Sequence, residues 1–203
     1  MSQIGVILYD GVEPIDIGGT VGVISMASRL VPGLAAVTVA REAGPVRCAG
    51  GLTVLAAHGF DDAPECDAWI VSGGPGWRAQ AEDAAMLGFL RRLDPARLAS
   101  VCTGALILGA AGLLEGRPAT TRRHASPGEE ASPVALLARM GVEARPAQIV
   151  DPPGGPATGG GVSLAHDLTL HVIGRLHGLA VRDAVARLIE YDRAFVANRA
   201  ALG

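Results

Sequence analysis

A cysteine stands at the junction between a strand pattern and a helix pattern. Cys102 follows the short apolar run 98–101 and precedes a Gly/Ala-rich helical pattern over 103–114. A sharp strand-to-helix turn places its sulfur near the helix N-terminus, where unpaired N–H groups and the helix dipole favour a thiolate. Gly104 and Ala105 remove side-chain bulk where such an elbow is crowded. The spacing predicts a nucleophile that is reactive near neutral pH.

The alternative for any cysteine is a structural role, because free cysteine is among the most buried residue types. Cys48 and Cys66 are predicted to pack in that way or to lie inert near the surface. Three cysteines without close spacing make neither a disulfide framework nor a zinc site. For Cys102 both interpretations stay open on its own pattern alone.

A carboxylate is expected at the same place as this cysteine. Asp16 lies between Ile15 and Ile17 after the first predicted strand, and catalytic groups in open α/β sheets gather beyond the carboxyl ends of the strands. If Asp16 points at Cys102, burial and a developing thiolate raise its pKa and suit it to shuttle a proton. A surface carboxylate or a helix N-cap is the alternative, as it is for Asp10 and Glu13.

A glycine-rich loop follows the fourth predicted strand. Gly73, Gly74 and Gly76 can act as a simple turn, or their N–H groups can approach a reacting atom and form an oxyanion hole with the amide of Thr103. The loop lacks the Lys-Ser/Thr ending of a P-loop, which disfavours a nucleotide phosphate. The adjacent Trp77 walls a pocket or simply packs.

The five histidines do not form a metal-binding set. His166 and His171 are five residues apart on a predicted helix, whereas residues that share a helix face are three or four apart. His166 follows three consecutive glycines, and whether it or Arg122 contributes to the site is left open by the sequence. We expect no metal site.

Composition excludes several functional classes. The net charge is −3 and the 17 basic residues are scattered, so no basic stripe indicates nucleic-acid binding. The apolar stretch 98–114 is short for a membrane span and is interrupted by glycines, and Met1–Ile4 has no charged signal-peptide region. We expect a cytoplasmic protein whose 203 residues form one domain, 1–203.

Strand and helix patterns alternate along the chain, which is typical of parallel βα units in a layered α/β/α domain with a mostly parallel sheet. The final helix has one apolar face, which is core or, alternatively, a dimer seam. The predicted strands are 4–8, 36–40, 53–56, 68–72, 98–101, 119–121 and 142–145, and the predicted helices are 15–30, 80–93, 103–114, 133–140, 163–177 and 180–199.

Several motifs together resemble the ThiJ/PfpI superfamily, and within it the isonitrile hydratase branch. They cover almost the whole chain: 15–17, 72–76, 99–105 continuing through 112–121, 158–162 and 188–192. The resemblance implies a flavodoxin-like three-layer sandwich, a homodimer, a small-molecule substrate, and neither cofactor nor metal. It also implies that Cys102 is the nucleophile, Asp16 its acid/base partner and Thr103 a neighbour on the elbow.

The chain also departs from its apparent relatives. Superfamily peptidases carry Cys-His-Gly at the elbow, whereas this chain has Cys102-Thr103-Gly104, which disfavours proteolysis. Hydratase-like chains commonly read Thr-Thr-His-Trp where this one has Thr-Thr-Arg122-Arg123, which puts the substrate in doubt. Two alternatives to a hydratase are considered. One is a ligand-sensing domain like that of AraC-type regulators, without its DNA-binding domain, and the other is a stress protein that signals through cysteine oxidation.

Overall fold

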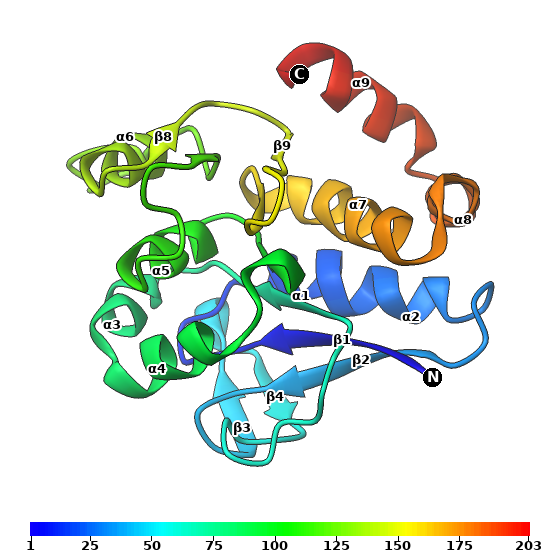
Figure 1. Ribbon diagram of the computed structural model, residues 1–203, viewed down its shortest axis with the longest axis horizontal. Helices are drawn as coiled ribbons and strands as arrows, with labels where there is room; N and C mark the ends of the chain where they lie inside the picture. Colours follow the sequence, from blue (N-terminus) through cyan, green and yellow to red (C-terminus); the bar gives the residue numbers. More distant parts are fainter.

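A six-stranded sheet has the order β2-β1-β5-β6-β10-β9. Figure 1 labels three of its strands, β1, β2 and β9. The computed structural model describes residues 1–203. Every neighbouring pair of strands is parallel except β9 and β10. The strands are β1 (Ser2–Ile7), β2 (Leu34–Val39), β5 (Ala68–Val71), β6 (Leu98–Ser100), β9 (Ile149–Val150) and β10 (Ala157–Gly159).

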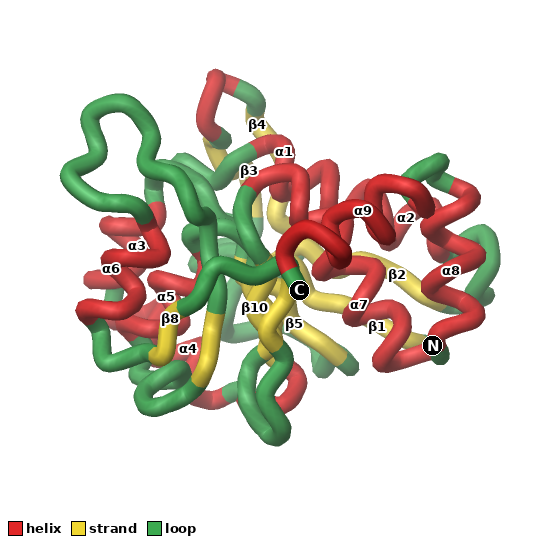
Figure 2. Tube along the Cα trace, turned by 90° about the horizontal axis from the view of Figure 1, so that it is seen from above, coloured by secondary structure: helices red, strands yellow, loops and turns green.

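Helices cover both faces of this sheet, which explains why its central strands are apolar throughout. Helix α2 packs on β2, α7 packs on β6 and β10, and α5 packs on β5 and β6 from the other side. Figure 2 shows α2, α7, α8 and α9 gathered at one end of the view and α3 to α6 at the other. The flavodoxin-like α/β/α sandwich is confirmed.

The helices have the following bounds: α1 (Pro14–Ile17), α2 (Val23–Ala27), α3 (Trp77–Glu82), α4 (Ala84–Arg92), α5 (Gly104–Ala110), α6 (Pro133–Arg139), α7 (Ala165–His177), α8 (Leu179–Leu188) and α9 (Asp192–Leu202). A π-helical turn, Gly18–Gly22, joins α1 to α2, so the helix predicted over 15–30 forms but ends at Ala27. None of the helices combines the length and apolar composition that crossing a membrane requires.

Three predicted strands form but lie outside the main sheet. The segment 53–56 is β4 (Thr53–Ala56), which pairs with β3 (Gly44–Arg47) in a hairpin. The strand predicted over 119–121 is observed as β7 (Pro118–Ala119) and shares only Ala119 with it, and the strand predicted over 142–145 shortens to β8 (Glu143–Ala144). These two strands pair only with each other. The main sheet instead recruits β9 and β10, which were not predicted. A strand pattern predicts that a segment is extended but does not predict which strand it pairs with.

Two predicted helices are broken. The segment 80–93 divides at Asp83, which ends α3 and caps α4 by accepting a hydrogen bond from the Ala85 N–H. The predicted helix 180–199 is two helices, because Glu190 adopts a φ of 56° between α8 and α9. Of the apolar face predicted there, Val185 and Phe195 are buried in the core cluster.

Candidate active site

The predicted elbow is present between β6 and α5. Cys102 has a φ of 53°, a left-handed conformation that costs about 1–2 kcal/mol in a residue with a side chain. Gly104 makes the turn possible, since a Cβ there would collide with the backbone oxygen of Val71. Such backbone strain is found where the surrounding structure holds a reactive side chain in place.

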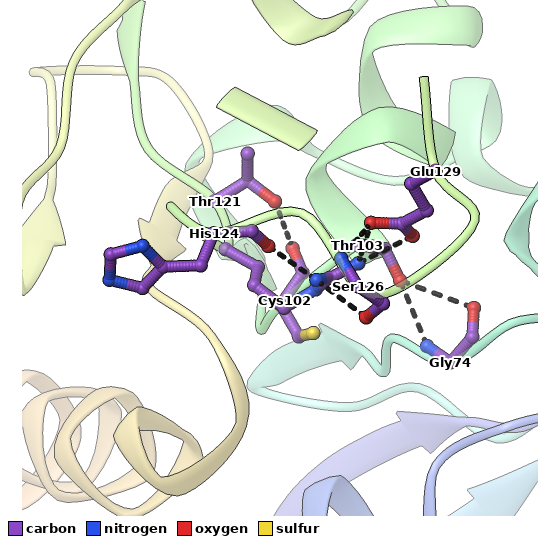
Figure 3. A network of polar contacts seen from close by, with 8 residues as sticks. Gly74, Cys102, Thr103, Thr121, His124, Ser126 and Glu129 are labelled. Atoms are coloured by element: carbon purple, nitrogen blue, oxygen red, sulfur yellow. Dashed lines mark hydrogen bonds and ion pairs between the residues drawn. The ribbon is translucent and has the colours of Figure 1, made fainter. Parts of the chain in front are cut away.

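Two hydrogen bonds hold the strained residue. The Cys102 N–H donates to the Gly160 oxygen at 3.1 Å, and the buried Thr121 hydroxyl donates to the Cys102 carbonyl at 2.6 Å (Figure 3). Gly160 directly follows β10. The role of Thr121 was not predicted from the sequence, because a threonine in a strand pattern ordinarily indicates only β structure.

Asp16 is brought to Cys102 as predicted from the strand ends. Its side chain is fully buried, and Oδ2 accepts the Gly73 N–H at 2.8 Å. A Cβ added to Gly73 would lie 2.8 Å from Asp16 Oδ2, 2.7 Å from the Cys102 Cβ and 2.6 Å from the Thr103 nitrogen. These three groups therefore converge on one glycine. Asp16 Oδ1 has no hydrogen-bond partner.

The pKa of Asp16 is raised to about 7, mainly by burial and to a smaller extent by the nearby Glu13 carboxylate. The Gly73 N–H and the Arg122 guanidinium act in the opposite direction. The predicted rise in this pKa is therefore confirmed, with desolvation as its main cause. A carboxyl group that titrates near neutral pH can both accept and return a proton.

The expectation of a resting thiolate at Cys102 is wrong. Burial raises the pKa of this thiol to about 11, and the Asp16 carboxylate is the second cause. The N–H groups of Val162 and Thr103 and the Arg122 guanidinium favour the thiolate, but desolvation outweighs them. Near neutral pH the sulfur keeps its proton, and a base is needed to activate it.

The three loop glycines do not offer the free amides that an oxyanion hole needs, which corrects that prediction. The Gly73 N–H donates to Asp16, the Gly74 N–H to Thr103 Oγ1 at 2.9 Å, and the Gly76 N–H to the Gly11 oxygen at 3.2 Å. The absence of a side chain matters more than the N–H groups do, because at Gly73 it leaves the space in which Asp16 and Cys102 approach each other. Of the three, Gly74 alone lines the cavity described below.

Thr103 fastens this loop to the elbow, and Tyr9 fastens it to the segment that follows β1. Beyond accepting the Gly74 N–H, the Thr103 hydroxyl donates to the Gly74 oxygen at 3.2 Å (Figure 3). The buried Tyr9 hydroxyl donates to the Ser72 oxygen at 2.9 Å. The Thr103 side chain thus positions the loop.

A cavity of about 460 Å³ opens above Cys102. Its wall includes Arg122, whose guanidinium donates to both oxygens of Glu129 at 2.6 and 2.8 Å and to Ser126 Oγ at 2.9 Å. The loop that carries these residues lies beside the elbow in Figure 3. The other wall residues are Glu13, Gly74, Pro75, Trp77, Thr103, Pro127, Gly128 and Val162. Arg122 therefore belongs to the site.

His166 does not line this cavity. Its ring stacks on Tyr191, with the ring centroids 5.0 Å apart, and its Nδ1 lies 3.0 Å from the Ser163 oxygen. No group of three or more His, Cys, Asp or Glu side chains is arranged to hold a metal ion. A larger cavity of about 740 Å³ between α8 and α9 contains neither a cysteine nor a histidine.

A model of the DJ-1/PfpI family matches residues 2–138. The chain belongs to the DJ-1/PfpI family. A solved structure of a ThiJ/PfpI family protein from Pseudomonas syringae superposes with a TM-score of 0.77 at 28% identity, covering 94% of this chain and 75% of that one. The family predicted from the motifs is thereby confirmed.

Two curated relatives of this DJ-1/PfpI protein differ in what they do. The isonitrile hydratase of Pseudomonas putida is 33% identical over 191 residues, which is 93% of this chain and 78% of the relative. The HTH-type transcriptional regulator GbdR of Pseudomonas aeruginosa is 29% identical over 197 residues. That match covers 94% of this chain but only about half of the regulator, 51%.

Proposed function

We propose that this DJ-1/PfpI protein is a cysteine-dependent hydratase of small electrophilic carbon compounds, most concretely of an isonitrile to an N-substituted formamide. One observation carries the proposal: the Cys102 Cβ and the Asp16 carboxylate both lie within 2.8 Å of the position that a Cβ on Gly73 would occupy, and Cys102 lines a cavity of about 460 Å³. The similarity to an isonitrile hydratase supports this choice of substrate.

In the first step Asp16 accepts the thiol proton while the sulfur attacks the terminal carbon of R–N≡C. The proton then passes to that same carbon, which gives the thioimidate Cys102–S–CH=N–R and restores the carboxylate. A pKa of about 7 at Asp16 and about 11 at Cys102 leave one proton on the pair between these values, as the step requires.

Water completes the cycle. It adds to the thioimidate carbon, one proton goes to nitrogen, and the tetrahedral adduct Cys102–S–CH(OH)–NH–R collapses. The hydroxyl proton returns to sulfur as the C–S bond breaks, which releases R–NH–CHO and the free thiol. Asp16 suits each transfer because its Oδ1 has no competing hydrogen-bond donor.

A second candidate is a ligand-sensing domain, favoured by the similarity to GbdR. In that case the cavity binds a small molecule without turnover, and Cys102 need not react. The third candidate, signalling by oxidation, is disfavoured because susceptibility to oxidation follows thiolate character, and burial raises the pKa of the Cys102 thiol.

The test is to incubate the wild-type protein and Cys102→Ala with an aryl isonitrile and to follow formamide by chromatography. Cys66→Ala is the matched control, since Cys66 is also buried but lies outside the cavity. We expect formamide from the wild type and from Cys66→Ala alone. Equal rates with Cys102→Ala would exclude the nucleophile, while binding without product would favour the sensing domain.

The homodimer implied by the family resemblance belongs to the same proposal. Sedimentation equilibrium of the purified chain measures it directly, and we expect a mass of about twice the 20.6 kDa of one chain. A mass of one chain across the micromolar range would contradict the dimer without touching the proposed chemistry.

A further inference from the structure

Not every charged side chain around the cavity above Cys102 has an ion-pair partner. Three charged side chains line its wall: Glu13, Arg122 and Glu129. Arg122 and Glu129 neutralise each other through the two-pronged ion pair at 2.6 and 2.8 Å. Glu13 has no ion-pair partner, and its carboxylate accepts no hydrogen bond from the protein. The wall therefore carries one uncompensated negative charge.

Glu13 is held where this charge acts on the reacting groups. Its backbone N–H donates to the Gly73 oxygen at 2.8 Å, which fixes it to the glycine where Asp16 and Cys102 meet. Its carboxylate is close enough to raise the pKa of Asp16, and it also raises the pKa of Cys48. The side chain is half-buried, so water screens it only in part.

Arg78 lies close to this wall but is not part of it. Arg78 lies with its guanidinium carbon 4.6 Å from the centroid of the Trp77 ring and is close enough to Glu129 to lower the pKa of that carboxyl. Arg122 is the only arginine in the wall. A cleft whose wall carries a net charge concentrates ligands of the opposite sign.

We propose that Glu13 makes this site selective for electrophiles that carry a positive charge, such as an ammonium or quaternary ammonium group attached near the reactive carbon. The inference rests on the proposed function, because it concerns the compound that Cys102 attacks. Glu13 acts as a specificity-determining residue: it attracts the cation of the substrate, while Cys102 and Asp16 carry out the chemistry on the carbon.

The experiment compares how fast three thiol reagents modify Cys102: a trimethylammonium-ethyl, a sulfonato-ethyl and a neutral methyl methanethiosulfonate. Each rate is measured by mass mapping of the Cys102 peptide and divided by the rate of the same reagent with free N-acetylcysteine. In the wild type we expect the cationic reagent to be favoured over the anionic one by roughly tenfold.

Two variants assign this preference to one side chain. Glu13→Gln reduces the preference severalfold and Glu13→Lys inverts it, whereas Glu130→Gln, an exposed glutamate outside the cavity wall, keeps it. Circular dichroism and thermal melting check that each variant is folded. Equal normalised rates in the wild type, or an unchanged preference in folded Glu13→Gln, would overturn the inference.

A parallel measurement separates this inference from the proposed function. Aryl isonitriles with a para trimethylammonium or a para carboxylate group are compared by kcat/KM. Hydration of both at equal rates would remove the charge selectivity and keep the hydratase. Charge-selective modification of Cys102 without formamide from either compound would contradict the proposed hydratase activity and still support the charge selectivity of the site.

Discussion

Two aspartates of this protein are fully buried, yet their surroundings differ. The Asp16 carboxylate accepts one hydrogen bond, from Gly73, and its Oδ1 has no partner. Asp167 accepts bonds from three side chains: Gln148 at 2.6 Å, Tyr191 at 2.8 Å, and Asn198 at 3.3 and 3.2 Å. Burial raises the pKa of both carboxyls.

The difference lies in what each carboxylate can still do. Both oxygens of Asp167 are occupied by donors from the residue before β9, from the turn before α9 and from α9, so Asp167 ties these segments to α7. Asp16 keeps one oxygen free, and its carboxylate lies near Cys102, which lines the cavity. A buried carboxylate whose hydrogen bonds are complete stabilises the fold, whereas one whose bonds are incomplete is available for chemistry.

Loss of the Asp16 carboxylate is expected to have the largest effect on activity. Asp16→Asn cannot accept the thiol proton, so we expect formamide production to fall by roughly a thousandfold, within the range of general acid–base catalysis. Single-turnover kinetics with an aryl isonitrile measure this. Asp167→Asn is the matched control and should stay within about tenfold of the wild type if it folds. Equal losses in both variants would remove the contrast.

The same Asp16→Asn variant should be more stable than the wild type at high pH. Because folding raises the pKa of Asp16 from 3.8 to about 7, its ionisation weakens the fold progressively as pH rises between these values. We expect the two proteins to be equally stable near pH 4 and the variant to be more stable by about 4 kcal/mol at pH 8. Urea titrations at both pH values measure the difference; a less stable variant at pH 8 would contradict this account.

For Asp167 the expected effect on stability has the opposite sign. An amide at this position would face the donor nitrogens of Gln148 and Asn198, so Asp167→Asn should lower the free energy of unfolding by about 2–3 kcal/mol. Urea unfolding at pH 7 tests this, with the half-exposed Asp183→Asn as a surface control. No loss in Asp167→Asn would show that these hydrogen bonds do not stabilise the fold.

Removal of a single donor should have the smallest effect. Tyr191→Phe deletes the 2.8 Å hydrogen bond to Asp167 but leaves the other donors, so we expect a loss of about 1 kcal/mol. Thermal unfolding followed by circular dichroism is sensitive enough to measure it. A loss as large as that of Asp167→Asn would mean that Tyr191 supports α9 mainly through packing.

The contrast between these carboxylates was only partly predictable from the sequence. Asp16 and Cys102 could be placed together, since each follows a strand and the carboxyl ends of parallel strands share one edge of the sheet. The hydrogen bonds of Asp167 could not be predicted, because Tyr191 and Asn198 reach it only when the helix is interrupted at Glu190. Glu190 is neither glycine nor proline, so the sequence gives no sign of the interruption. The pattern of 180–199 indicated one unbroken helix.

The pKa of the thiol was mispredicted for a physical reason. Proximity to a helix N-terminus can be read from the sequence, but the degree of burial cannot, and at Cys102 burial dominates. The partners of Gly73, Gly74 and Gly76 likewise depend on tertiary structure. Thr121 and Val162, which act on Cys102 through its backbone oxygen and its sulfur, carry no distinctive local signal.

The central claim is that Asp16 and Cys102 act as one proton-sharing pair. The most direct test is the rate at which neutral iodoacetamide alkylates Cys102 between pH 5 and 9, in the wild type and in Asp16→Asn. We predict that the wild-type rate rises through a midpoint near 7, the pKa of Asp16, and that this step is absent from Asp16→Asn. A wild-type profile without the step, or an Asp16→Asn profile that retains it, would contradict the account.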